Sequence, residues 1–306
     1  MKLSPRMKKI LKWSCLMLFV VMTVGCTVPR DANNNIILIT NDTTFSSIMA
    51  DENWFSAIFV YPLSKLINIL APKITVGGAI IAITILVNGI VALATYKSTI
   101  ATQQMQLIQP ELEKIQRKYE GRDDDTSKMR QAAEMQALYK KYNISPTGTL
   151  LVTFIQFPIL MAMYMAVQRS EAVQTGSFLG MKMDSTPLTG IQGALKGDAI
   201  GWMYLLLFIF MAVCQFLSMK LPQMIQKKKA EAEAEAAKHH RRPDVPENKS
   251  MKFMQIYMMA MIMMFGLVWP SAMALYWAIN SLVNIIKTLV VQKIIDKNNA
   301  NKKGAR

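Results

Sequence analysis

Residues 79–97 read AIIAITILVNGIVALATYK, an apolar run that carries one amide, Asn88, and ends on a lysine. An α-helix rises about 1.5 Å per residue and needs roughly 20 residues to cross the hydrocarbon of a bilayer, so this run is long enough to span at 79–96. Similar runs follow, of which only the last contains a charged residue; they cover 147–167, 199–219, 253–269 and 270–291. The sequence therefore predicts an all-α membrane protein with five transmembrane helices.

Basic residues are sorted to one side of these runs. Nine Lys and Arg lie in 97–142, nine in 220–252 and six in 287–306, against three in 27–78 and three in 168–199. Short loops rich in Lys and Arg stay in the cytoplasm, so the first three segments are predicted inside and the other two outside. The net charge of +15 is thus an orientation signal, and it requires no DNA partner.

The N-terminus has the pattern of a secretion signal. Five basic residues precede the apolar run 13–24, which is followed by Gly25 and Cys26. This pattern predicts a lipoprotein signal peptide over 1–25, with Cys26 as the lipidated, palmitate-bearing first residue of the mature chain. The alternative is an uncleaved sixth helix with an ordinary buried cysteine.

The segments between the spans differ in character. Residues 26–55 are rich in Asn, Asp and Thr and are expected to form an external tether. Residues 56–78 carry an apolar stripe but are too polar to span, which predicts a helix in the outer interface. The other segments are an external loop over 168–198 with a short helix at 177–183, a cytoplasmic loop over 220–252 that begins by extending the third span, and a basic cytoplasmic tail over 292–306, disordered from Asp296.

Residues 97–146 are predicted to form a cytoplasmic helical hairpin. Pro110 fits the first turn of a helix that runs to Glu120, and Asp125 can cap a second helix that runs through Tyr142. The apolar residues expected to pack the two helices together are Leu112, Ile115 and Tyr119 on one side and Met129, Ala133, Met135 and Leu138 on the other.

The apolar runs contain no acidic residue, and the chain shows no catalytic motif, phosphate loop or metal-ligand spacing, so the sequence predicts neither an enzyme nor a cofactor or metal. What the runs carry is uncharged polarity at helical spacing. The residues predicted to line a polar groove are Thr84, Asn88, Thr153, Gln156, Gln215, Trp277 and Asn280. Their bias toward the inner half of the membrane favours a groove open to the cytoplasm. The alternative is a set of interhelical hydrogen bonds, each of about 0.6 kcal/mol.

Several motifs together resemble the YidC-type membrane protein insertases. They are the run from Thr84 through Lys97, Gln109-Pro110-Glu111-Leu112, Gln156-Phe157-Pro158-Ile159 before Met163-Tyr164, and Pro270 with Leu275-Tyr276-Trp277. The resemblance implies five spans around a cytoplasm-open groove, in a bacterial cell membrane, with a lipid-anchored external N-terminus and a cytoplasmic C-terminus. It also implies an insertase and chaperone that receives hydrophilic client segments and releases apolar ones into lipid. The partners are then nascent membrane proteins, with the Sec translocon and the ribosome as further partners.

The chain departs from this family at Asn88, where many members have an arginine. An amide forms hydrogen bonds but carries no charge, so we expect weaker discrimination between acidic and neutral clients. Two other classes stay open. A channel or transporter would be expected to show related halves or intramembrane ionisable groups. A membrane-anchored scaffold lipoprotein would need only the inner loops.

Overall fold

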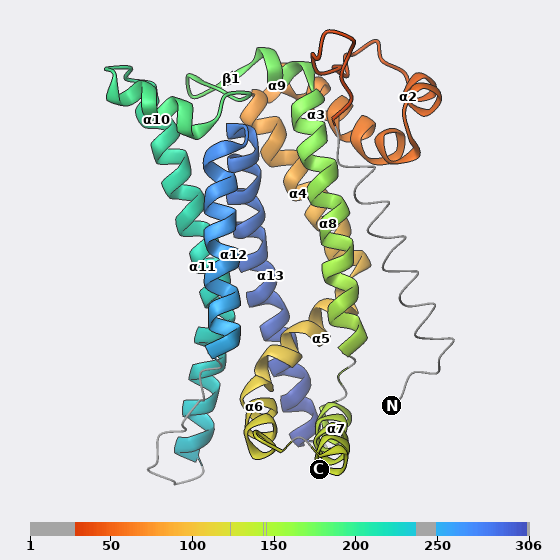
Figure 1. Cartoon of the computed structure of the whole chain (residues 1–306), viewed down its shortest axis with the longest axis vertical. Coiled ribbons are helices and arrows are strands. Elements are labelled where there is room, and N and C mark those ends of the chain that lie inside the picture. The colour runs from red at the N-terminus through yellow and green to blue at the C-terminus, as the bar shows by residue number, and fades with distance from the viewer. Residues whose placement is uncertain (1–27, 123, 143, 145, 237–248, 305–306) are drawn as a thin grey trace.

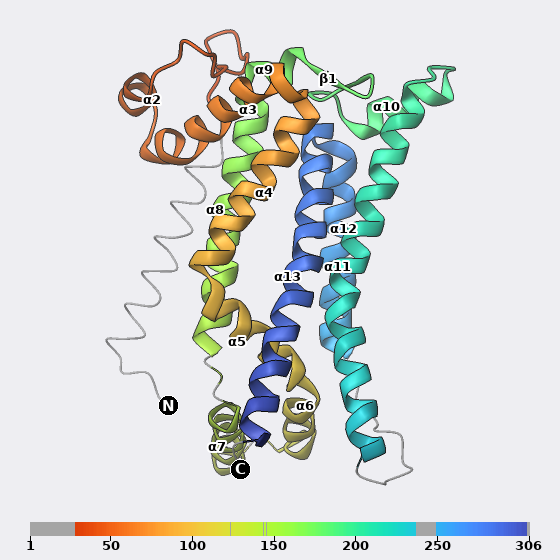
Figure 2. The ribbon, with the colours of Figure 1, turned by 180° about the vertical axis from the view of Figure 1, so that it is seen from behind.

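The computed structural model describes residues 28–122, 124–142, 144, 146–236 and 249–304. Long helices lie side by side in a bundle, with smaller elements at both ends (Figures 1 and 2). The bundle helices are α4 (Val76–Ala94), α8 (Pro146–Arg169), α11 (Gly201–Ala236), α12 (Lys249–Val268) and α13 (Ser271–Gly304). The predicted signal peptide and Cys26 lie outside the described residues.

In the described part of the chain, four helical stretches are long and apolar enough to cross a membrane. They are Ser56–Ile74, Val76–Ala94, Gly201–Lys229 and Ser271–Lys297, with Gln255–Val268 as a shorter apolar helix. The all-α membrane class is therefore confirmed. The first stretch was predicted to be too polar to span, and that prediction was wrong in length and hydropathy. It lies at the upper end of the bundle in Figure 1.

The helix of the first apolar run ends before the predicted boundary. Thr95 leaves the helical conformation, with φ −104° and ψ 13°, and its hydroxyl donates to the carbonyl of Val91 at 2.7 Å. The chain then turns into α5 (Tyr96–Leu107), which packs on α8 and α13. The Gln103 side chain donates to the carbonyl of Thr288 at 3.1 Å and to Oε1 of Gln292 at 3.0 Å, so α5 is held against α13.

The predicted hairpin is present as α6 (Gln109–Lys118) and α7 (Asp125–Lys141) at the lower end in Figure 1, here called the hairpin end. Leu112 and Leu138 are buried against each other's helix, as expected. The prediction for Met129 was wrong, because its side chain is 74% exposed. The cap is Asp124 rather than Asp125, since Asp124 has the extended backbone of a cap and its carboxylate accepts from Ser127 N at 2.7 Å.

A polar contact also joins the two hairpin helices. Glu134 accepts from Lys118 at 2.6 Å and from the Tyr119 hydroxyl at 2.8 Å. The hydrogen bond from Lys118, followed by that from Tyr119, holds the pKa of Glu134 below its ordinary value. The two hairpin helices are thus joined by buried apolar contacts and by the contact of Glu134 with Lys118 and Tyr119.

The upper end in Figure 1, here called the loop end, holds the smaller elements. They are α2 (Phe45–Asp51), the π-helix η1 (Ser56–Val60), α3 (Tyr61–Ile74), α9 (Glu171–Thr175), β1 (Ser177–Phe178), β2 (Met181–Lys182) and α10 (Pro187–Leu195). The short helix predicted at 177–183 was wrong, because β1 and β2 form an antiparallel hairpin there. Its two-residue turn places Leu179 and Gly180 at positive φ, 53° and 82°, which a helix excludes.

The segment expected as a tether is folded over its described part. Ile39 is fully buried, donates to the carbonyl of Arg169 at 2.6 Å and accepts from Asn68 of α3 at 2.6 Å. The Arg169 side chain, 0% exposed, forms a two-pronged ion pair with Glu52 at 2.7 and 2.5 Å. Residues 28–53 are therefore clamped to the loop end of α8, and the polar face of α3 points into the protein.

The main core lies where α4, α11 and α13 pack together, continuing to the loop end. The third span extends as one helix to Ala236, as predicted. The expectation of disorder from Asp296 was wrong, because α13 continues to Gly304. Two contacts support that extension, since Asp296 accepts from Lys229 of α11 at 2.6 Å and from Gln292 at 3.0 Å.

Candidate functional site

The polar side chains of α4 are buried, and they donate their hydrogen bonds to carbonyls of α4 itself. Thr84 is 0% exposed and its hydroxyl donates to the carbonyl of Ile80 at 2.7 Å. Asn88 is 4% exposed and its amide donates to the carbonyl of Thr84 at 2.9 Å. Side-chain bonds to the same helix satisfy donors without fixing a neighbour.

Gln215 of α11 has a hydrogen-bond partner on another helix. Its Oε1 accepts from the Ser281 hydroxyl of α13 at 2.6 Å. This is an interhelical hydrogen bond of the kind that commonly stabilises membrane bundles. At this position the structure supports the alternative interpretation, in which the polar residue holds helices together.

Trp277 belongs to a row of aromatic rings near the loop end of the bundle. It is buried and stacks on Trp269, with ring centroids 5.4 Å apart and planes 20° apart. Trp269 in turn lies 4.8 Å from Phe265 of α12 and 4.4 Å from Tyr164 of α8. The row connects α8, α12 and α13 with apolar surface. Asn280 lies three residues further along α13, about 5 Å deeper than this row.

Asn280 is the predicted residue with the most unusual environment. Among the described residues, the buried side-chain atoms without a hydrogen-bond partner include Asn280 Oδ1 and the hydroxyl of Tyr276. More than about 90% of buried polar groups in proteins are paired, so two orphans on one helix are notable. The sequence reasoning missed Tyr276 as a functional candidate. The available signal was its spacing of four residues from Asn280, which places both on one face.

The polar side chains of the bundle lie at similar distances from the loop ends of their own helices. Counting along each helix from its loop end, Asn280 lies about 14 Å down, Asn88 about 18 Å, Gln156 about 20 Å and Gln215 about 21 Å. Gln156 is half-buried on α8. The side chain of Thr153 lies outside the described part. Helix α13 contacts both α11 and α4, whereas α8 packs mainly on α5, with smaller contacts to α3 and η1.

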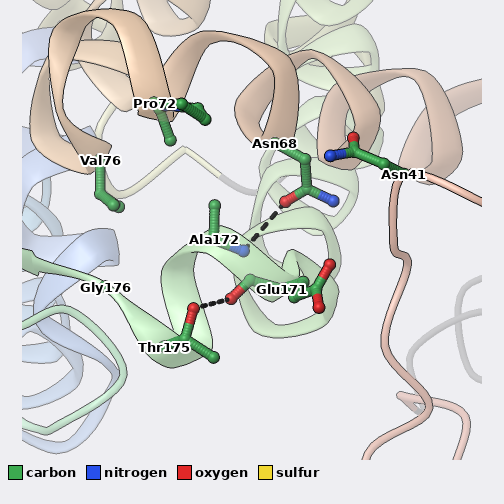
Figure 3. A pocket seen from close by; sticks show the side chains of 9 residues that line it. Asn41, Asn68, Pro72, Val76, Glu171, Ala172, Thr175 and Gly176 are labelled. Atoms are coloured by element: carbon green, nitrogen blue, oxygen red, sulfur yellow. Dashed lines mark hydrogen bonds between the residues drawn. The ribbon is translucent and has the colours of Figure 1, made fainter.

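A separate cavity of about 350 Å³ lies at the loop end, lined by Asn41, Asn68, Ala71, Pro72, Val76, Glu171, Ala172, Thr175 and Gly176. Figure 3 shows the Asn68 carbonyl oxygen pointing at the backbone of Ala172, 3.0 Å away. The Asn68 amide also bonds to Ser170 and Ile39. The buried side-chain groups of Asn68 in this cavity thus have hydrogen-bond partners within the protein, whereas the Tyr276 hydroxyl and Asn280 Oδ1 of α13 have none.

The chemistry available in the bundle is that of binding. The mid-level side chains are amides, hydroxyls and an indole, which donate and accept hydrogen bonds. In the described part of the chain, no group of three or more His, Cys, Asp or Glu could hold a metal ion. This arrangement suits a polar peptide segment lying along α4 and α13.

Comparison with known proteins gives a consistent result. The family model described as 60Kd inner membrane protein matches residues 69–299. The membrane protein insertase YidC 2 of Listeria innocua is 28% identical over 95% of this chain and 86% of its own length. The insertase MisCA of Bacillus subtilis is 28% identical over 80% of this chain and 82% of its own. The insertase YidC 1 of Streptococcus pyogenes serotype M3 is 30% identical over 76% of this chain and 72% of its own length.

Proposed function

The chain belongs to the 60Kd inner membrane protein family of YidC-type insertases, and from this membership we propose how its structure performs insertion. It is a multi-pass bacterial membrane protein that acts on client proteins by binding, without a covalent step. The polar level between α4 and α13 receives the hydrophilic segment of a nascent membrane protein. The outer surfaces of the same helices guide the apolar segment into lipid.

One observation carries the polar half of this proposal. The Tyr276 hydroxyl, at the level of the aromatic row, and Asn280 Oδ1, about one turn deeper, are buried and have no hydrogen-bond partner among the described residues. A peptide group that enters hydrocarbon without a partner costs several kcal/mol. A client segment that bonds to Asn280 and Asn88, once α4 and α13 have separated to admit it, avoids part of that cost, while it satisfies the unpaired Asn280 oxygen.

The apolar half of the proposal rests on exposed side chains. The large apolar residues exposed on α4 are Ile85, Leu86, Ile90 and Leu93, and those on α13 include Ile286, Leu289 and Val290. Flexible methionines, Met258 and Met264, are exposed on α12. Met side chains repack around varied apolar partners, which suits a surface that must accept many different transmembrane segments.

The proposed topology follows the charge distribution. The hairpin end is cytoplasmic, the loop end is external, and α4, α8, α11, α12 and α13 are the five spans. Lipidated Cys26 then anchors the N-terminus at the outer leaflet. The aromatic row at Trp277 closes the groove toward the outside, so the groove opens to the cytoplasm. Nascent chains arrive there from the ribosome, alone or with the Sec translocon.

The test is insertion by purified protein in reconstituted vesicles. The double variant Asn88→Leu with Gln156→Leu removes two amides from the polar level at little change in volume. We expect at least a tenfold loss of client insertion, since each lost hydrogen bond is worth about 1 kcal/mol and both are removed. Thermal unfolding in detergent should be unchanged within a few degrees.

The matched control is Gln136→Leu, on the exposed side of α7. It should insert the client at the native rate. If the double variant also inserts normally, the polar level has no part in insertion and the scaffold interpretation gains support.

A further inference from the structure

The three helices of the main core pack closely only in their loop-end halves. In α4 the buried residues lie between Val76 and Asn88, and none of residues 89–94 is buried. In α11 no residue from 215 to 229 is buried, whereas in α13 all of residues 271–278 are. Segments with few buried contacts open more readily than closely packed ones. The hairpin-end half of the bundle is therefore the half that can separate.

One segment, which contains β1 and β2, fastens the loop ends of the same three helices. The Phe178 ring lies on Gly77 of α4, where an added Cβ would be 2.3 Å from a ring carbon. The Tyr204 hydroxyl of α11 accepts from a backbone nitrogen of β2 at 2.8 Å. The Ser185 carbonyl accepts from the backbone nitrogen and the hydroxyl of Ser271, the first residue of α13, at 2.8 and 2.7 Å. Separation at the loop end would break these contacts together.

At the hairpin end, the contacts across the bundle are made by polar side chains of and around α5. Helix α5 packs mainly on α8 and runs from the lower end of α4 toward α13 (Figures 1 and 2). The Gln103 amide donates twice to α13, to the Thr288 carbonyl at 3.1 Å and to Oε1 of Gln292 at 3.0 Å. The Gln106 carbonyl accepts from Gln226 of α11 at 2.7 Å. These bonds join the α5 and α8 side of the bundle to the α11 and α13 side.

Asp296 holds the Gln292 side chain in the orientation that this contact needs. Its carboxylate accepts from the amide nitrogen of Gln292 at 3.0 Å and from Lys229 of α11 at 2.6 Å. Because its nitrogen is turned to Asp296, Gln292 presents its oxygen to Gln103. Gln292 lies about 18 Å further along α13 than Asn280, toward the hairpin end. The contact therefore lies between the polar residues of the groove and the hairpin end.

We propose that the contact between Gln103 and Gln292, here called the latch, closes the hairpin end of the bundle and opens before a client's hydrophilic segment reaches Asn88 and Asn280. The proposal rests on the proposed insertase function. Opening exchanges side-chain hydrogen bonds for bonds to water or to the client, so its net cost is small. Thr95, which leaves the helical conformation between α4 and α5, is the joint about which α5 turns. Gln103 and Gln292 are thus positioning residues for client entry.

The experiment locks the latch and measures client insertion in vesicles. In a Cys214→Ser background, Gln103→Cys and Gln292→Cys are joined by a short bis-methanethiosulfonate crosslinker. We expect a loss of insertion of roughly tenfold or more, since the locked protein cannot populate the open state, and full recovery when a thiol reductant removes the crosslink. Methyl methanethiosulfonate, which modifies both cysteines without joining them, should leave insertion intact.

The matched control joins Ser185→Cys and Ser271→Cys at the loop end, where no opening is proposed. It should insert the client at the native rate with and without its crosslink. If the protein without crosslinks inserts no client, the insertase function fails. If the locked latch inserts at the native rate, or if the loop-end crosslink blocks insertion equally, the latch fails alone.

A second measurement follows the opening without a crosslink or a client. Gln103→Leu removes the two bonds that Gln103 donates, so a cysteine that replaces Asn280 should react roughly tenfold faster with a water-soluble maleimide, because a buried thiol reacts in proportion to the open population. Gln136→Leu, on the exposed side of α7, should leave the reaction rate unchanged. Equal rates with Gln103 and with Gln103→Leu overturn the proposal.

Discussion

At the scale of residues, individual polar side chains have separate roles that sequence spacing alone does not distinguish. Asn88 and Gln215 both lie in apolar runs, yet Asn88 donates to its own helix and Gln215 binds Ser281 of α13. Spacing fixes the face of a helix on which a residue lies. The partner depends on the neighbouring helix, which is why neither the bond of Gln215 to Ser281 nor the unpaired Tyr276 was predicted.

The ion pair between Glu52 and Arg169 predicts a large effect of one substitution. Glu52→Gln keeps the shape of the side chain but leaves the fully buried Arg169 without a counter-charge. Breaking a buried pair in this way costs about 3–5 kcal/mol. We expect this loss in the free energy of unfolding, measured by SDS titration in mixed micelles. Asp51→Asn, at the exposed neighbouring position, should change it by less than about 0.5 kcal/mol.

At the scale of elements, two glycines show how helix contacts depend on what a side chain would meet. A Cβ at Gly201 would lie 2.4 Å from the Ala194 nitrogen and 2.5 Å from the Gly190 oxygen, both backbone atoms of α10. A Cβ at Gly266 would lie 2.4 Å from the terminal methyl of Met211. Backbone cannot move aside cheaply, whereas the end of a methionine can.

Gly201→Ala is therefore expected to destabilise the packing of α10 on α11 by about 1–3 kcal/mol, through overpacking. Gly266→Ala should cost much less, because alanine gains about 1 kcal/mol over glycine within a helix. The SDS unfolding midpoints of the two variants provide the measurement. Equal midpoints would show that α10 shifts freely on α11.

The elements also show which local sequence signals were sufficient to predict secondary structure. The hairpin of α6 and α7 was predicted because proline, an acidic cap and apolar spacing agree over several turns. The β-hairpin at 177–182 was not predicted. Its turn requires a positive φ at Leu179, a conformation that leucine rarely adopts and that a leucine in the sequence therefore does not indicate. The continuation of α13 to Gly304 was missed because its polar sequence is ordered partly by the contact of Asp296 with α11.

At the scale of the whole molecule, the fold class followed from hydropathy and the proposed orientation from charge. The arrangement of the helices depends on contacts between distant segments, such as Gln103 with Gln292, which periodicity cannot give. The same limitation applies to residues 28–53, whose polar composition suggested a tether although Arg169 and Asn68 hold them in place.

The proposed topology predicts opposite accessibility for the two ends. In a Cys214→Ser background, cysteines replace Leu195 of α10, 78% exposed, and Met129 of α7, 74% exposed. A membrane-impermeant maleimide added to intact cells should label position 195 and leave position 129 unlabelled until the membrane is opened. The reverse pattern would invert the orientation of the bundle and of its groove.

The pairing of Glu52 with Arg169 has a consequence for how this protein is made. The two residues are 117 positions apart in the chain. At about 5–20 residues per second, synthesis of the intervening segment takes on the order of 10 s. In the proposed topology, Glu52 crosses the membrane first. It has no counter-charge there until a second translocation brings Arg169 to the same side. The newborn protein is thus itself a substrate for insertion, and its outer end closes only after that second crossing.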